Sequence, residues 1–170
     1  MTARNPSANA YTLVVGLGLT GLSVLRYLQR LGEPVIVADS RDIPPRLNEF
    51  RESFSGIPLH TGAFDEQLFL RARRIVVSPG VSLNLPALRR AHEQGIEISG
   101  DIDLFAHEVS APVVGITGSN GKSTVTTLLT AMANEAGLNA VAGGNIGLPV
   151  LDLPMLEDYF IDLGFRLQWT

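Results

Sequence analysis

Two glycine-rich segments, residues 16–21 and 117–124, restrict most strongly how this chain can fold. Each follows a run of β-branched and other apolar residues, and each precedes a run with helical spacing. A glycine-rich turn between a strand and a helix lets the backbone approach a phosphate group, which the amino terminus of the helix attracts. The sequence therefore predicts two nucleotide-type strand–loop–helix units in series.

The rest of the chain continues this alternation of strands and helices. Strands are expected at 11–15, 34–38, 57–60, 74–78, 96–99, 113–117 and 139–142. Helices are expected at 20–31, 84–94, 101–108 and 122–136, and a polar helix is expected after the loop 41–45, ending near residue 53. In the first helix, Leu22, Leu25, Leu28 and Leu31 have the spacing of one buried face. The pattern predicts an α/β fold in which helices cover parallel sheets.

A domain boundary is expected at Ser110-Ala-Pro112, because the alternation of strands and helices restarts after it. Residues 1–109 are predicted to form a Rossmann-like domain with a parallel sheet. Residues 110–170 are predicted to form a P-loop α/β domain, for which the sequence offers only two or three strands and one long helix.

The first loop reads Gly16-Leu-Gly-Leu-Thr-Gly21 and has the Gly-x-Gly-x-x-Gly pattern of diphosphate-binding turns. Asp39 ends the second expected strand, 18 residues after Gly21. A carboxylate at that position can accept a hydrogen bond from a ribose hydroxyl. The pattern leaves NAD, FAD and a UDP-sugar open as ligands, and also a tight turn that binds nothing.

The second loop reads Thr117-Gly-Ser-Asn-Gly-Lys-Ser-Thr124 and is a P-loop variant. The strict pattern has glycine at the position of Ile116, but the Gly-Lys-Ser part is intact. Lys122 is expected to reach the outer phosphates of a nucleotide, and the Ser123 hydroxyl to ligate Mg²⁺. Asp162, at the end of an apolar run, is a candidate second metal ligand, although that run also fits a strand edge or a chain-end turn.

Composition excludes several classes of protein. The 17 acidic and 13 basic residues give a net charge of −4, which disfavours a nucleic-acid partner. The chain has no cysteine, so a disulfide framework, a thiol nucleophile and Cys-ligated metal are excluded, and the cytoplasm is the expected location. No apolar run approaches the ~20 residues that a membrane-spanning helix needs, so membrane insertion is not expected.

Residues 115–124, Gly-Ile-Thr-Gly-Ser-Asn-Gly-Lys-Ser-Thr, followed by Gly143-Gly-Asn-Ile-Gly147, resemble the Mur ligases. These ATP-dependent amide ligases build the peptide of bacterial peptidoglycan. The segments 16–21, 39–41, 78–80 and 100–105 are similar to the same family, in the same order. Within it, the chain is most similar to the branch that adds D-glutamate to UDP-N-acetylmuramoyl-L-alanine.

The resemblance implies a role for each matching residue. The substrate UDP-N-acetylmuramoyl-L-alanine would contact Leu19, Thr20, Asp39, Arg41, Ser78, Gly80 and Asn145. The phosphates of ATP would contact Gly118, Ser119, Asn120, Gly121, Lys122, Ser123 and Thr124. Ser123 would also ligate Mg²⁺, with Asp162 as a further candidate ligand, and Lys122 would be the catalytic cation.

The resemblance also implies a reaction, in which ATP converts the substrate carboxylate to an acyl phosphate that the amine of D-glutamate attacks. The similarity extends over residues 11–152, and the family enzymes are longer than this chain. We therefore expect a partial ATPase domain and an incomplete form, inactive by itself. Two alternatives stay open at this point: a fragment that binds UDP-sugar without catalysis, and an oxidoreductase that uses nicotinamide or flavin.

Overall fold

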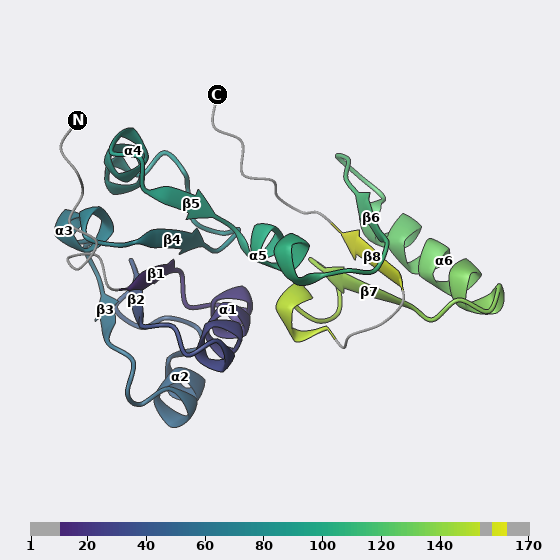
Figure 1. Ribbon diagram of the computed structural model, residues 1–170, viewed down its shortest axis with the longest axis horizontal. Helices are drawn as coiled ribbons and strands as arrows, with labels where there is room; N and C mark the ends of the chain where they lie inside the picture. Colours follow the sequence, from purple (N-terminus) through teal and green to yellow (C-terminus); the bar gives the residue numbers. More distant parts are fainter. Residues whose placement is uncertain (1–10, 154–157, 163–170) are drawn as a thin grey trace. The chain divides into compact units, whose positions relative to one another are not determined.

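The computed structural model describes residues 11–153 and 158–162. It shows two compact units, which divide between Gly100 and Asp101 (Figure 1). The first unit contains β1 (Thr12–Val15), α1 (Leu19–Arg30), β2 (Val35–Asp39), α2 (Leu47–Ser53), β3 (Leu59–Thr61), α3 (Glu66–Leu70), β4 (Arg74–Val77), α4 (Pro86–Glu93) and β5 (Glu97–Ser99). The second contains α5 (Asp101–Glu108), β6 (Val113–Ile116), α6 (Lys122–Glu135), β7 (Ala140–Gly144), the 3₁₀ helix η1 (Val150–Asp152) and β8 (Asp158–Asp162).

Helix α5 lies in the second unit, whereas the sequence analysis assigned it to the first domain. The physical reason is its packing, because α5 contacts η1, which follows β7. The buried side chains of this region include Leu104 and Phe105 of α5 and Val150 and Leu151 of η1.

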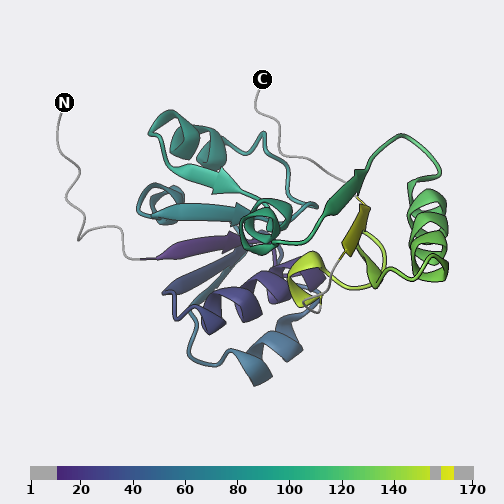
Figure 2. The same ribbon diagram turned by 45° about the vertical axis from the view of Figure 1, so that its right-hand side comes forward.

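The first unit is an α/β fold with a five-stranded parallel sheet, as the sequence predicts. Its strand order is β3-β2-β1-β4-β5, and every neighbouring pair is parallel. The chain builds outward from β1 to β3, then crosses to β4 and builds outward in the opposite direction. Connections between parallel strands are almost always right-handed. Connections that run in opposite directions along the sheet therefore place their helices on opposite faces of it. Helices α1 and α2 accordingly cover one face, and α3 and α4 the other (Figures 1 and 2).

The core of the first unit forms around β1 and α1. Leu13, Val14 and Val15 are at most 1% exposed, because helices cover both faces of the central strand. In α1, the leucines at 22, 25 and 28 are fully buried, which confirms the predicted apolar face. Leu31 is 51% exposed instead, because the helix ends at Arg30 and Gly32 follows with φ of +66°.

A network of charged residues joins the amino ends of β1 and β4. The Glu33 carboxylate accepts hydrogen bonds from Arg73 at 2.6 Å and from Arg74 at 3.0 Å. It also accepts one at 3.0 Å from the hydroxyl of Thr12, which is fully buried. The network lies at the opposite end of the sheet from the glycine-rich loop, so we interpret it as structural.

The second unit contains a three-stranded parallel sheet of order β6-β8-β7. Residues 159–162, for which the sequence left a strand edge or a chain-end turn open, belong to β8, which is the central strand of this sheet. Helix α6 contacts all three strands. Several large apolar residues of this unit are about half exposed, among them Val113 and Val114 of β6 and Leu128 and Met132 of α6. Among the helices in the described ranges, none is long and apolar enough to cross a lipid bilayer.

Candidate functional site

The glycine-rich loop of the first unit is packed too closely for larger residues at two positions. Gly16 has φ of +100°, and a Cβ on it would lie 2.9 Å from Cβ of Ser78. A Cβ on Gly21 would lie 2.1 Å from the carbonyl oxygen of Gly16, which is a backbone clash. The first and third glycines of the pattern therefore keep the turn tight, and the third lets α1 approach it.

Ser78 joins this loop to the end of β4. Its hydroxyl donates a hydrogen bond to the carbonyl oxygen of Gly16 at 3.0 Å, and its N–H donates to Val15 at 2.9 Å. The strand order changes direction between β1 and β4, and ligands of open α/β sheets bind at the carboxyl ends of such strands. Gly80 is exposed, and a Cβ there would meet no atom within 4 Å.

Helix α1 begins beside this loop with its N–H groups available to an anion. Its N-cap is Gly18, no side chain caps it, and its first turn holds no acidic residue. Leu19 is 54% exposed and Thr20 is partly exposed at the first two helical positions. The free N–H groups and the positive end of the helix dipole favour a phosphate at this position.

Asp39, at the end of β2, is only 2% exposed. Its carboxylate accepts hydrogen bonds from the N–H of Leu17 at 2.7 Å and from the N–H of Arg41 at 3.0 Å. It also accepts two from the Arg41 guanidinium, at 2.8 Å from Nε and 2.6 Å from Nη2. Burial raises the pKa of Asp39, but the hydrogen bonds from Arg41 and Leu17 outweigh burial and lower the pKa below its ordinary value.

The glycine-rich loop of the second unit connects β6 to α6. Gly118 and Gly121 have φ of +154° and +76°, and Gly121 is the N-cap of α6 without a side-chain cap. The Lys122 ammonium donates a hydrogen bond at 2.7 Å to the carbonyl oxygen of Gly118, so its charge lies over the loop. The remaining predicted nucleotide contacts are all exposed: Ser119, Asn120, Ser123 and Thr124.

The carboxyl ends of the second sheet bring the other predicted residues to the same edge. Asp162 of β8 lies opposite Ile116 of β6 on one side and Gly144 of β7 on the other. Asp162 therefore ends the strand between the glycine-rich loop and the turn that carries Asn145. That turn is closed by a hydrogen bond at 3.1 Å from the Gly144 N–H to the Leu148 carbonyl, and Asn145 is exposed in it. Within the described ranges, no three His, Asp or Glu side chains group as a metal site.

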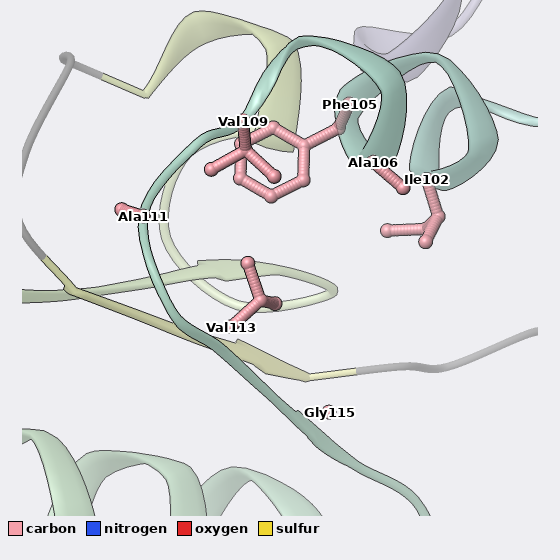
Figure 3. Close-up of a pocket in the computed structure, with 7 residues that line it drawn as sticks. All are labelled: Ile102, Phe105, Ala106, Val109, Ala111, Val113 and Gly115. Atoms are coloured by element: carbon pink, nitrogen blue, oxygen red, sulfur yellow. The ribbon is translucent and has the colours of Figure 1, made fainter.

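A pocket of about 300 Å³ lies between α5 and β6 of the second unit (Figure 3). The side chains that face it include Ile102, Phe105 and Val109 from the α5 side and Val113 from β6. All of its lining residues that the structure describes are apolar, so it offers no charged group to a phosphate.

The structure thus gathers the predicted residues into two groups, one at the carboxyl edge of each sheet. The first group is the loop with Leu19 and Thr20, Asp39 with Arg41, and Ser78. The contacts of Leu17 and Gly16 could not be predicted from the sequence, since both are made by backbone atoms. The glycine pattern itself was the only available signal for them.

Comparison with known families identifies the class of protein. The model of the family described as "Mur ligase MurD-like, N-terminal domain" matches residues 10–100. The chain belongs to this family.

Individual relatives extend the similarity beyond the first unit. A UDP-N-acetylmuramoylalanine–D-glutamate ligase of Marinobacter nauticus is 54% identical over 164 residues, covering 94% of this chain and 36% of that protein. The ligase of the same name from Nitrosococcus oceani is 48% identical, covering 97% of this chain and 37% of that protein. The chain thus spans little more than a third of the length of these relatives.

A solved structure supports the fold. The pseudomurein peptide ligase type C of Methanothermus fervidus matches with a TM-score of 0.51 and 27% identity. The match covers 92% of this chain and 33% of that one.

Proposed function

We propose that this chain is the amino-terminal part of an ATP-dependent ligase that adds D-glutamate to UDP-N-acetylmuramoyl-L-alanine in peptidoglycan precursor synthesis. The observation that carries the proposal is the 54% identity to a ligase of that name, which extends through both glycine-rich loops. We also propose a cytoplasmic location, where such a nucleotide-linked precursor and ATP are both present.

In this proposal the first unit binds the UDP part of the substrate. The N–H groups at Leu19 and Thr20 receive the diphosphate, because the start of α1 has no side-chain cap. Arg41, whose side chain is 51% exposed, lies on the uridine side of the loop. Ser78 and Gly80, which follow β4, border the proposed UDP site.

The second unit is then part of a P-loop ATPase domain, and its residues fit ATP and Mg²⁺. The loop from Gly118 to Thr124 has glycine at both positive-φ positions, a single ammonium group and an uncapped helix start. Bound ATP would supply the phosphoryl group that activates the substrate carboxylate. Ser123 would hold the metal ion, with Asp162 as a second candidate ligand.

The charges and amides of the chain have separate tasks in this scheme. Lys122 offsets negative charge on the outer phosphates, which is the main protein contribution to phosphoryl transfer. Its ammonium is held over the loop by the hydrogen bond to the Gly118 carbonyl, which places the charge where the outer phosphates would bind. Asn145 contacts the muramoyl-alanine part of the substrate from the same sheet edge.

The oxidoreductase alternative requires Asp39 to accept a hydrogen bond from a cofactor ribose. Asp39 is 2% exposed and already accepts hydrogen bonds from Leu17 and Arg41, which disfavours that role. The binding-only alternative applies to the 170 residues by themselves. It is favoured by the half-exposed apolar residues of β6 and α6, which indicate a second unit whose surfaces are not fully covered.

A chimeric enzyme tests the ligase proposal. Residues 11–153 of this chain would replace the matching segment of the Marinobacter nauticus ligase, and D-glutamate addition would be assayed. We expect an active chimera that loses activity about 100-fold or more with Lys122→Ala. Arg90→Ala, which removes an exposed cation from α4, is the control and should leave the rate unchanged. An active chimera insensitive to Lys122→Ala would refute the role of the second loop.

Nucleotide binding by the 170-residue chain can be followed at one amine. Lys122 is the only lysine in the sequence, so amine acetylation read by mass spectrometry reports on it and on the chain amino terminus. We expect Mg²⁺·ATP to slow acetylation of Lys122 and to leave the amino terminus unaffected. Equal acetylation rates at Lys122 with and without millimolar Mg²⁺·ATP would contradict ATP binding by this chain.

A further inference from the structure

We propose that Asp39 is a positioning residue that couples the glycine-rich loop to Arg41 and accepts no hydrogen bond from the ribose hydroxyls of the nucleotide. The inference rests on the proposed UDP site and assigns Asp39 a different task within it. The sequence pattern and the family resemblance had placed Asp39 against the ligand. The arrangement of its hydrogen-bond donors points to an indirect role.

The Asp39 carboxylate has no acceptor site left for a ribose hydroxyl. An ionised carboxylate offers about four lone-pair sites on two oxygens. Asp39 Oδ1 accepts from the N–H and Nε of Arg41, and Oδ2 accepts from the N–H of Leu17 and Nη2 of Arg41. All four sites are therefore used within the protein, and a ribose hydroxyl could bind only by displacing one of these donors.

Asp39 and Arg41 differ sharply in burial. At 2% exposure, the carboxylate has almost no surface for a ligand, whereas the side chain of Arg41 is 51% exposed. An arginine has five N–H donors, and Nε and one N–H of Nη2 are used on Asp39. The rest of the planar guanidinium is therefore held in a fixed orientation and available to acceptor oxygens of the nucleoside half.

Asp39 is also connected to the diphosphate half of the site. Leu17 lies between the first two glycines of the loop, and its N–H bond to Asp39 fixes the loop against the end of β2. One carboxylate thus fixes both the glycine-rich loop, which lies 22 residues earlier in the sequence, and Arg41, which lies two residues later. Weakening it should disturb both halves of the site together.

The experiment is calorimetric titration of the 170-residue protein with UDP and with its 2′-deoxy and 3′-deoxy analogues. The variants are Asp39→Asn, Arg41→Ala and the double variant. Arg90→Ala is the control, because the Arg90 side chain is also more than half exposed and pairs with Glu66 at the same 2.6 Å distance. Thermal unfolding of each variant verifies that it is folded.

We expect Asp39→Asn to weaken UDP binding about 10- to 100-fold, and to weaken both deoxy analogues by the same factor. In the Arg41→Ala background its effect should be smaller by about fivefold or more, because part of its action is through Arg41. Arg90→Ala should bind like the wild type.

Two results would overturn the inference while leaving the UDP site in place. One is an Asp39→Asn effect that disappears with a deoxy analogue, which would show direct contact with that hydroxyl. The other is full additivity of the two substitutions. If Asp39→Asn does not fold, Asp39→Glu takes its place, and an Asp39→Glu effect that disappears with a deoxy analogue overturns the inference. Absence of UDP binding by the wild type would instead refute the proposed function.

Discussion

At the scale of a single residue, Gly21 has no room for a side chain, and this makes a specific prediction. Gly21→Ala places a Cβ 2.1 Å from the Gly16 carbonyl oxygen, so α1 or the loop must move. We expect a loss of about 1–3 kcal/mol or more in the free energy of unfolding, together with weaker UDP binding. Urea denaturation measures the first quantity.

Gly18→Ala is the matched control for stability. Gly18 belongs to the same loop, but its φ is −104° and a Cβ there would meet no atom within 4 Å. The alanine variant should unfold at nearly the same urea concentration as the wild type. Equal stability of the two alanine variants would show that the close contact at Gly21 is not a constraint.

The lowered pKa of Asp39 predicts how the free energy of unfolding depends on pH. Its pKa is lower in the folded protein than in the unfolded chain, so the unfolded chain binds the proton more readily. The stabilisation it provides is therefore fully present above the unfolded value of about 4, and is lost as the pH falls through the lower folded value.

Wild type and Asp39→Asn should thus differ by about 1.5–3 kcal/mol in unfolding free energy at pH 7, and by less as the pH falls below 4. Urea denaturation at pH 7 and pH 3 measures the difference. Asp42→Asn, which removes an exposed carboxylate three residues after Asp39, controls for net charge. A difference that stays constant between the two pH values would contradict the lowered pKa.

At the same scale, the sequence predicted where the site residues lie better than what they do. The position of Asp39 at a strand end followed from the β-branched run before it and from its spacing to the loop. Its four internal hydrogen bonds did not follow, because they depend on how β1 and β2 pair and on the backbone of Leu17. Pairwise geometry of this kind is not encoded in a local motif.

At the scale of elements, one side chain fastens α6 to β7. The Asn134 amide donates to the Ala140 carbonyl at 3.0 Å, and its oxygen accepts from the Ala140 N–H at 2.9 Å. Ala140 is 5% exposed, so water cannot replace the two hydrogen bonds that its backbone makes with Asn134. Asn134→Ala should destabilise the second unit by about 1–3 kcal/mol and accelerate amide exchange at Ala140. Asn139→Ala, at an exposed neighbouring position, should do neither; similar exchange in both variants would argue against this role.

The elements that the sequence predicted are those whose residues carry a local signal. Strands β1, β2 and β4 follow from continuous apolar runs, and α1 and α6 from glycine turns and apolar spacing. Helix α3 was missed, because it has five residues and is anchored mainly by Phe69, which is fully buried. Strand β8 was left undecided, since it is defined by pairing with β6 and β7 rather than by its own composition.

At the scale of the whole molecule, the five strands of the first sheet all precede residue 100. A chain of residues 1–100 should therefore fold and bind UDP by itself. A second chain of residues 1–109 adds α5, which lies in the other unit and should contribute little. Equal thermal unfolding temperatures of the two chains would agree with this division. A clearly more stable 1–109 chain would place the boundary after α5, as the sequence analysis had it.

The central claim is that the carboxyl edge of the first sheet binds the UDP part of a peptidoglycan precursor. The most direct measurement is calorimetric titration of the 170-residue protein with UDP-N-acetylmuramoyl-L-alanine and, separately, with NADH. The account predicts saturable binding of the UDP compound, weakened by Arg41→Ala and unaffected by Arg90→Ala, and no saturable binding of NADH. Saturable NADH binding that UDP fails to displace, or no binding of the UDP compound at millimolar concentration, would contradict it.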